Sequence, residues 1–141
     1  MSNNETLSLE IGTWAQAVSI TDVPKHVQDQ ALLNILDAVG IAFASTHYEF
    51  ATRSIAASVA LGSGPRGVIA CSERLTVRDQ AMLNGILIHG LDFDDTHVPG
   101  VIHATASALP TAIAIADDRE LSGNDLVLGF LVALEIGARV G

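Results

Sequence analysis

The chain has 141 residues, of which 49% are hydrophobic and only 4% are aromatic. This length gives one ordinary domain, and a core filled by Ala, Leu, Ile and Val favours closely packed helices over sheets. Sixteen Asp and Glu against seven Lys and Arg give a formal net charge of −9. Nucleic acids and anionic membrane surfaces are bound by basic patches, so the charge argues against both as partners.

Cysteine usage and hydropathy restrict the setting further. Cys71 is the only cysteine, which excludes a disulfide framework or a Cys-rich zinc site within one chain. The N-terminal stretch MSNNETLSLE has neither the basic nor the apolar region of a signal peptide. The longest apolar runs, such as LVLGFLVALEIG at 126–137, are too short to span a bilayer. The sequence therefore predicts a cytoplasmic protein without a membrane span.

Helical periodicity dominates the first half of the chain. A first helix is predicted over 5–18, and a second helix, capped by Thr21 or Asp22 with Pro24 in its first turn, runs to about residue 45. A third helix is expected over 48–60, followed by the loop GSGPRG and a short extended piece. The apolar stripe predicted to face the core from the second helix consists of Val27, Ala31, Leu32, Ile35, Leu36, Val39 and Phe43.

The second half is predicted to hold three more helices. The fourth covers about 77–90, with a capping box at Thr76 and Asp79 and an end at Gly90. The fifth covers about 104–117, where Pro110 either kinks the helix or delays its start. The sixth covers 123–140, with Ser122 and Asp125 as its cap. The fourth and sixth helices are apolar on nearly all sides. That pattern fits either a compact bundle with buried central helices or a piece of a larger domain that needs further protein to cover it.

The segment HGLDFDDTHVPGVIH, residues 89–103, gathers three Asp, one Thr and three His. An EF-hand starting at Asp92 is excluded, because its sixth and twelfth positions are His97 and His103 instead of Gly and Glu. A transition-metal site of His97, His103 and an aspartate has suitable ligand types, but no HExxH-like spacing supports it. A triad through Ser107 lacks the GxSxG elbow.

Besides the metal site, two interpretations of this segment remain open from spacing. One is general acid–base chemistry by a carboxylate and a histidine near a helix N-terminus, whose free N–H groups bind a substrate carboxylate. The other is a solvated loop whose aspartates cap helices. On the fourth helix, His89 and Asn84 are predicted to be buried, hydrogen-bonded core positions, with places on the wall of a pocket as the alternative. Glu135 is predicted to pair with Arg139 one helical turn later.

Several stretches together resemble the MmgE/PrpD family, which includes 2-methylcitrate dehydratase, cis-aconitate decarboxylase and an iminodisuccinate epimerase. They are LTVRDQAMLNG (75–85), NGILIHGLDFDDTH (84–97), His103, LPTAIAIAD (109–117) and SGNDLVLGFLVALEIGARVG (122–141). Members of this family have a large all-helical domain and a smaller α+β domain. The resemblance implies an all-α fold, a helical bundle in which residues 1–141 form an incomplete N-terminal portion of the helical domain, without the second domain.

The resemblance also implies a chemistry that needs no metal or organic cofactor. The family dehydrates, decarboxylates or epimerises small di- and tricarboxylic acids. Carried over to this sequence, His103 is an acid–base or substrate-binding group, Asp92 and Thr96 orient it or bind substrate, and Asp95 and His97 are further substrate-binding candidates. Ala104 stands where the family usually has a proline. The family's later Lys, His and Tyr site residues have no counterpart in these 141 residues.

Charge indicates that such a site is incomplete. A polycarboxylate needs cationic partners, and no Lys or Arg lies within 89–110. The sequence thus predicts half of an enzyme site, completed by a complementing chain, a homo-oligomer or further polypeptide. The alternatives are a non-catalytic packing or dimerisation module and a small metal-binding helical protein.

Overall fold

The computed structural model describes residues 6–140, and in this range the chain is all-α, as predicted. The described residues form α1 (Leu7–Ala17), α2 (Lys25–Ser45), α3 (Glu49–Leu61), α4 (Val77–His89), α5 (Ala104–Asp118) and α6 (Gly123–Val140). Two 3₁₀ turns, Ile20–Asp22 and Val98–Gly100, interrupt the connections. The expected extended piece is a minimal antiparallel pair, β1 (Arg66–Gly67) and β2 (Arg74–Leu75), with Arg66 opposite Leu75. Residue 5, the start of the predicted first helix, lies outside the described residues.

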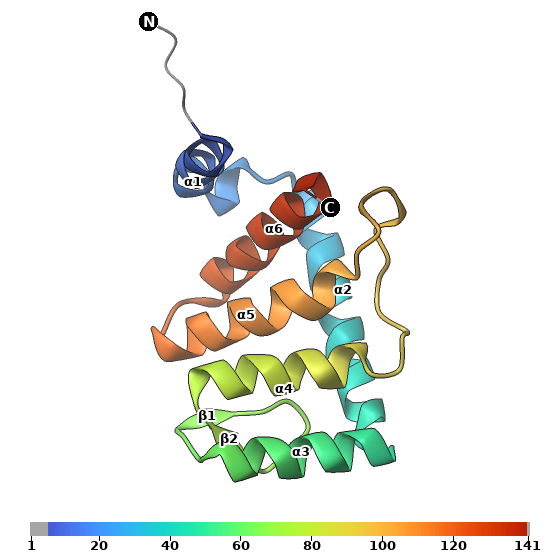
Figure 1. Cartoon of the computed structure of the whole chain (residues 1–141). Coiled ribbons are helices and arrows are strands. Elements are labelled where there is room, and N and C mark those ends of the chain that lie inside the picture. The colour runs from blue at the N-terminus through green and yellow to red at the C-terminus, as the bar shows by residue number, and fades with distance from the viewer. Residues whose placement is uncertain (1–5, 141) are drawn as a thin grey trace, which may run out of the picture.

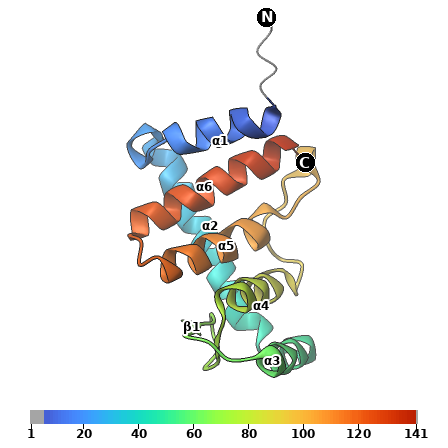
Figure 2. The same cartoon turned by 60° about the vertical axis from the view of Figure 1, so that its left-hand side comes forward.

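The helices α3, α4, α5 and α6 stack one on another, and α2 crosses this stack on one side (Figure 1). Figure 2 shows the same crossing from another direction, with α1 lying beside α6 at the end of the stack. In this order α4 and α5 are neighbours along most of their length. The loop between them, residues 90–103, therefore lies along one edge of the stack, where α4 ends and α5 begins (Figure 1).

The core lies between α2, α4 and α5. Leu83, Leu87 and Ile88 of α4 are fully buried, together with Leu109 of α5. Each such side chain contributes roughly 1.5–3 kcal/mol by leaving water. Asn84 is also fully buried and its Oδ1 accepts a hydrogen bond from the Ile69 N–H at 2.9 Å, which confirms it as a core residue.

Local capping follows the sequence in two of three places. The Thr76 hydroxyl accepts from the Asp79 N–H, and the Ser122 hydroxyl accepts from the Asp125 N–H, as predicted for α4 and α6. The predicted cap of α2 by Thr21 or Asp22 is wrong. Asp22 instead closes a capping box with Ser19 on the preceding 3₁₀ turn, and α2 begins after it at Lys25. The helix α5 continues through Pro110.

The predicted core stripe of α2 is only partly correct. Leu32, Leu36 and Phe43 are exposed, with Leu36 retaining 68% of its accessible surface. Ala31 of the stripe is buried as predicted, and the helix also buries Ala38 and Ala42, because small side chains let its backbone approach α4 and α5 closely. In α6 only Phe130 is fully buried. Both helices thus present apolar surface that the described chain does not cover.

Among residues 6–140, no helix combines the length and the apolar character needed to cross a membrane.

Candidate functional site

The loop 90–103 joins the last residue of α4 to the first turn of α5. Because α4 and α5 pack side by side, their adjoining ends bring His89 and His103 together. The two imidazole rings lie edge to face with centroids 4.8 Å apart. Gly90 follows His89 with an ordinary helical φ of −61°, so it is not needed for a left-handed turn. A side chain there would collide with the ring of Phe50 on α3, since an added Cβ lies 2.2 Å from it.

Asp94 links the two histidines. Its side chain retains only 1% exposure, and its Oδ1 lies 3.1 Å from His89 Nδ1 and 3.5 Å from His103 Nδ1. A carboxylate buried from water needs partners that donate hydrogen bonds or carry positive charge. Here the hydrogen-bonding partner is His89 at the end of α4, and the His103 ring approaches to 3.5 Å from the start of α5 without a hydrogen bond, so Asp94 lies between the two rings.

Asp92 approaches His103 from the side opposite to Asp94. Its Oδ1 lies 3.6 Å from His103 Nε2, and its side chain is 78% exposed. The Asp92 backbone has φ +58°, a left-handed conformation in which Asp is tolerated better than most residues. His103 thus has one carboxylate near each ring nitrogen, one buried and one open to solvent. We call His89, Asp92, Asp94 and His103 the His–Asp cluster.

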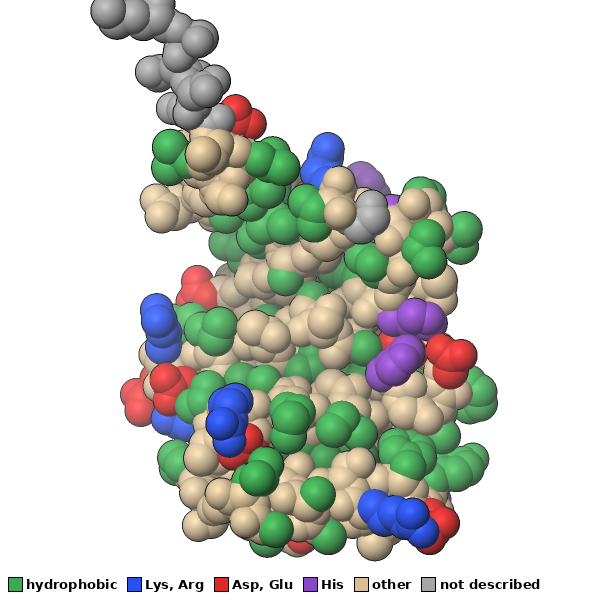
Figure 3. All heavy atoms as spheres, viewed as in Figure 1, with side chains coloured by type: hydrophobic (Ala, Val, Ile, Leu, Met, Phe, Trp, Pro, Cys, Tyr) green, Lys and Arg blue, Asp and Glu red, His purple; other side chains and the backbone are tan. Residues whose placement is uncertain are grey.

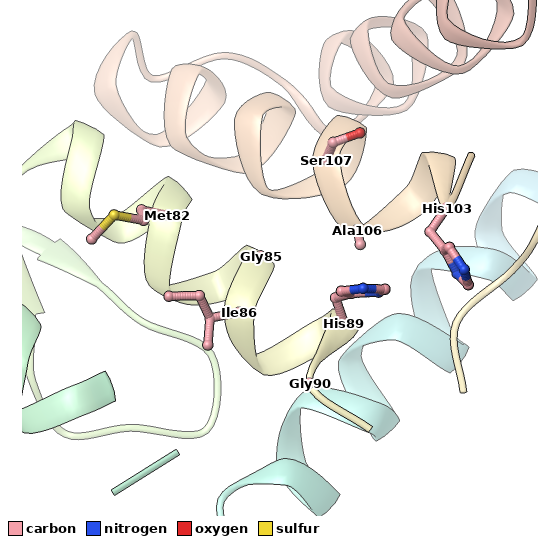
Figure 4. Close-up of a pocket in the computed structure, with 8 residues that line it drawn as sticks. All are labelled: Met82, Gly85, Ile86, His89, Gly90, His103, Ala106 and Ser107. Atoms are coloured by element: carbon pink, nitrogen blue, oxygen red, sulfur yellow. The ribbon is translucent and has the colours of Figure 1, made fainter. Parts of the chain in front are cut away.

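A cavity of about 620 Å³ opens beside the cluster between α4 and α5. His89 and His103 line it together with Met82, Ile86, Ala106 and Ser107. In Figure 4 the rings of His89 and His103 lie next to each other at one end of this space, with Met82 and Ile86 farther along α4. The cavity is therefore mainly apolar, with two imidazoles at its polar end.

Asp95 and His97 lie apart from the cluster and line a different cavity, one that also borders α2 and α6. The Asp95 carboxylate accepts a hydrogen bond from the Thr105 N–H at 3.1 Å, in the first turn of α5. His97 Nδ1 accepts from the Gly100 N–H at 3.1 Å within a 3₁₀ turn. Both side chains shape the loop, and Asp95 already occupies one of the N–H groups that the sequence assigned to a substrate carboxylate.

The other candidates near the cluster have simpler surroundings. Thr96 is exposed on the loop, and the contacts that join the four members of the cluster do not include it. Ser107 donates a hydrogen bond to the Ala104 carbonyl oxygen at 3.1 Å, which is a helix-internal bond and not a nucleophile–base contact.

Histidine and acidic side chains gather at this end of α4 and α5, with no Lys or Arg beside them in Figure 3. Five of the seven Lys and Arg, all within residues 6–140, form ion pairs elsewhere: Lys25 with Asp29, Arg53 with Glu49, Arg66 with Asp117 and Asp118, Arg78 with Asp79, and Arg139 with Glu135. The last pair confirms the prediction for Glu135. The described part of the chain thus supplies no Lys or Arg ion pair to the cluster.

Two members of the cluster were not among the predicted site residues. His89 was predicted to be a buried core residue, which is wrong: its side chain is 52% exposed, because it ends α4 and projects past the packed face. It lines the cavity between α4 and α5, which was the alternative interpretation. Asp94 was interpreted only as part of a solvated loop or as a cap. One feature of the sequence could have indicated their contact: His89 lies at a predicted helix end, five residues before Asp94 in a short loop.

Comparison with known proteins gives a consistent result. Residues 9–141 match the family model described as the MmgE/PrpD N-terminal domain. A cis-aconitate decarboxylase from Aspergillus terreus is 26% identical over an alignment that covers 96% of this chain and 29% of the relative. The mouse cis-aconitate decarboxylase is 30% identical over 75% of this chain and 23% of its own length. The human cis-aconitate decarboxylase is 38% identical over 48% of this chain and 15% of its own length. The chain spans less than a third of the length of these relatives.

Proposed function

Since the chain belongs to the MmgE/PrpD family, we propose that it carries part of the active site of a cofactor-independent lyase or isomerase acting on a small di- or tricarboxylic acid. Decarboxylation of cis-aconitate or a close analogue is the reaction we favour, because relatives over most of the chain are named cis-aconitate decarboxylases. Dehydration and epimerisation are the other reactions of this group.

The contact of His103 with two carboxylates is the observation that carries the proposal. Asp94 meets one ring nitrogen from a buried position and Asp92 lies near the other at the solvent side. An imidazole held in this way is suited to proton transfer at the nitrogen that faces the open side. When a carboxylate leaves as CO₂, its bonding electrons stay on the substrate carbon, and a proton from His103 would complete the reaction.

The roles of the other residues follow from their positions. Asp94 and His89 orient the His103 ring, Asp92 faces its reactive nitrogen, and exposed Thr96 provides a neutral hydrogen-bonding group for substrate. Asp95 and His97 support the loop and are substrate-binding candidates only through the second cavity.

The charge of the site requires a complement. A di- or tricarboxylate would meet Asp92 and Asp94 without a Lys or Arg paired to either. We therefore propose that further polypeptide or a second chain supplies cationic groups, in a cytoplasmic assembly. The exposed apolar side chains of α2, including Leu32, Leu36 and Phe43, support the idea that this chain packs against more protein.

The test is an NMR titration of the isotope-labelled chain with cis-aconitate, 2-methylcitrate and an aspartate-like diacid, with the substrate signals followed in deuterated water. Because the cationic groups are missing, we expect weak binding, with shifts at the backbone amides of Asp92, Thr96 and His103 that appear only at millimolar acid and are largest for the acid that fits. These shifts should disappear in His103→Ala and persist in His47→Ala, a matched change at an exposed histidine.

Two outcomes would contradict the proposal. A folded chain whose spectrum is unchanged by all three acids at high millimolar concentration favours the packing module. Shifts that survive His103→Ala place the ligand elsewhere. Turnover by the chain alone would support the assignment of the residues and would overturn only the requirement for cationic groups from outside.

A further inference from the structure

The His–Asp cluster has a second property that proton transfer does not require. One ligand atom from each of its four residues can be chosen such that all four atoms lie within 4.8 Å of one another. Two of them are imidazole nitrogens and two are carboxylate oxygens, contributed by the end of α4, the loop and the start of α5. Four donors that converge from three separate segments are the usual arrangement of a metal centre.

The distances suit a small transition-metal ion. In a tetrahedral zinc site with bonds of 2.0–2.2 Å, neighbouring ligand atoms are about 3.4 Å apart. The cluster has separations of 3.1 Å between His89 Nδ1 and Asp94 Oδ1 and 3.5 Å between Asp94 Oδ1 and His103 Nδ1, and with one atom from each residue, Asp92 included, all four lie within 4.8 Å of one another. Small adjustments of exposed side chains would place one donor atom of each residue around an ion.

The ligand types discriminate among metals. Calcium and magnesium select all-oxygen sites, whereas imidazole nitrogens favour zinc and its neighbours in the first transition row. His103 Nδ1 is buried and forms no hydrogen bond with the described residues, so no hydrogen bond in this range competes with an ion for this nitrogen. The two carboxylates have no Lys or Arg ion pair among the described residues, and a divalent ion would balance their charge.

We propose that the His–Asp cluster is a binding site for a divalent transition-metal ion of the zinc type, with His89, Asp92, Asp94 and His103 as ligands. This use of the cluster goes beyond the proposed acid–base function and competes with it. An ion bound to His103 Nδ1 prevents the ring from carrying the second proton that proton donation from the other nitrogen requires, so metal binding inhibits the proposed reaction. The cavity between α4 and α5 leaves room for a further ligand on the ion.

The test measures binding directly, without substrate. The purified chain is stripped with a chelator, dialysed, and titrated with zinc sulfate by calorimetry in a non-chelating buffer near pH 7.5. We expect one ion per chain. His89→Ala should weaken binding at least about tenfold, because it removes one of four ligands from an exposed helix end and leaves the core intact. Asp94→Asn should weaken it similarly, with circular dichroism confirming the fold.

Controls separate the cluster from the rest of the molecule. His47→Ala removes an exposed histidine outside the cluster, and His97→Ala removes the histidine on the other side of the loop. Both variants should bind zinc with the affinity and stoichiometry of the unchanged chain. Visible absorption of the cobalt-loaded chain should report nitrogen–oxygen coordination that is lost in His89→Ala. Absence of zinc binding, or binding that is unaffected by His89→Ala, would overturn the metal site. Neither result bears on the substrate titration, so the two proposals fail independently.

Discussion

The two sides of the loop between α4 and α5 each carry an aspartate and a histidine, but these side chains have different contacts. On one side, Asp94 and His103 contact each other and side chains from other segments. On the other side, Asp95 and His97 each accept a hydrogen bond from a backbone N–H within a few residues of the loop. Asp95 and His97, which are hydrogen-bonded to the backbone, stabilise the conformation of the loop. Asp94 and His103 face other side chains, and this arrangement is suited to binding a ligand or transferring a proton.

The largest expected difference between the two sides is in catalysis. In any assembly of this protein that turns over a polycarboxylate, His103→Gln should lower kcat by about 10²–10⁴-fold, since it removes the group that transfers the proton. His97→Gln should change kcat far less, because its ring is bonded to the Gly100 N–H. Steady-state kinetics of both variants provide the measurement. Equal losses from the two substitutions would erase the functional distinction between the two sides.

A smaller difference is expected in stability. Asp94→Ala should lower the free energy of unfolding by about 2 kcal/mol, because it leaves a buried gap and removes the partner of two imidazoles. Asp95→Ala removes a single bond to the Thr105 N–H at a helix start and should cost about 1 kcal/mol. Urea denaturation followed by circular dichroism measures both. If Asp95→Ala were the more destabilising change, Asp94 would not be the residue that organises this edge of the stack.

The smallest expected effect is the pH dependence of stability at Asp125, an aspartate that caps α6 and lies outside the His–Asp cluster. Hydrogen bonds from the Ser122 hydroxyl and the Ser122 N–H lower the pKa of Asp125 below its usual value. A folded-state pKa below the unfolded one contributes stability above the unfolded pKa, and this contribution is lost as the pH falls through the folded pKa. Asp125→Asn should therefore be destabilising near neutral pH, and its effect should shrink as the pH falls below the usual Asp pKa of about 3.9. Urea midpoints at pH 7 and pH 3 provide the comparison, and a difference that persists unchanged at pH 3 would contradict this origin.

Prediction from the sequence succeeded where the determining interactions are local. The caps at Thr76 and Ser122 depend on residues three positions apart, and the predicted bounds of α4 and α6 agree with the structure to within about one residue. It failed where packing decides. The pattern of α2 placed Leu32 and Leu36 in the core, whereas close approach of the neighbouring helices selects its alanine face.

The candidate site divides in the same way. Asp92 and His103 were identified together, and the structure places them 3.6 Å apart, although their roles remain predictions. Asp94 was overlooked because nothing in DFDDT distinguishes the buried carboxylate from its two exposed or capping neighbours. His89 was misplaced because an apolar helix suggests burial, and only the position of the helix end shows that the side chain leaves the core.

The sequence by itself determined the all-α fold, the helix bounds within a few residues, the acidic character and the family, because these depend on composition, spacing within single segments and matching motifs. Only the tertiary structure decided which polar side chains of residues 89–103 meet. Asp94 lies between His89 and His103 because α4 and α5 pack side by side and end at the same edge of the stack. The packing of two helices across a loop is a non-local property, and no single segment of the sequence contains it.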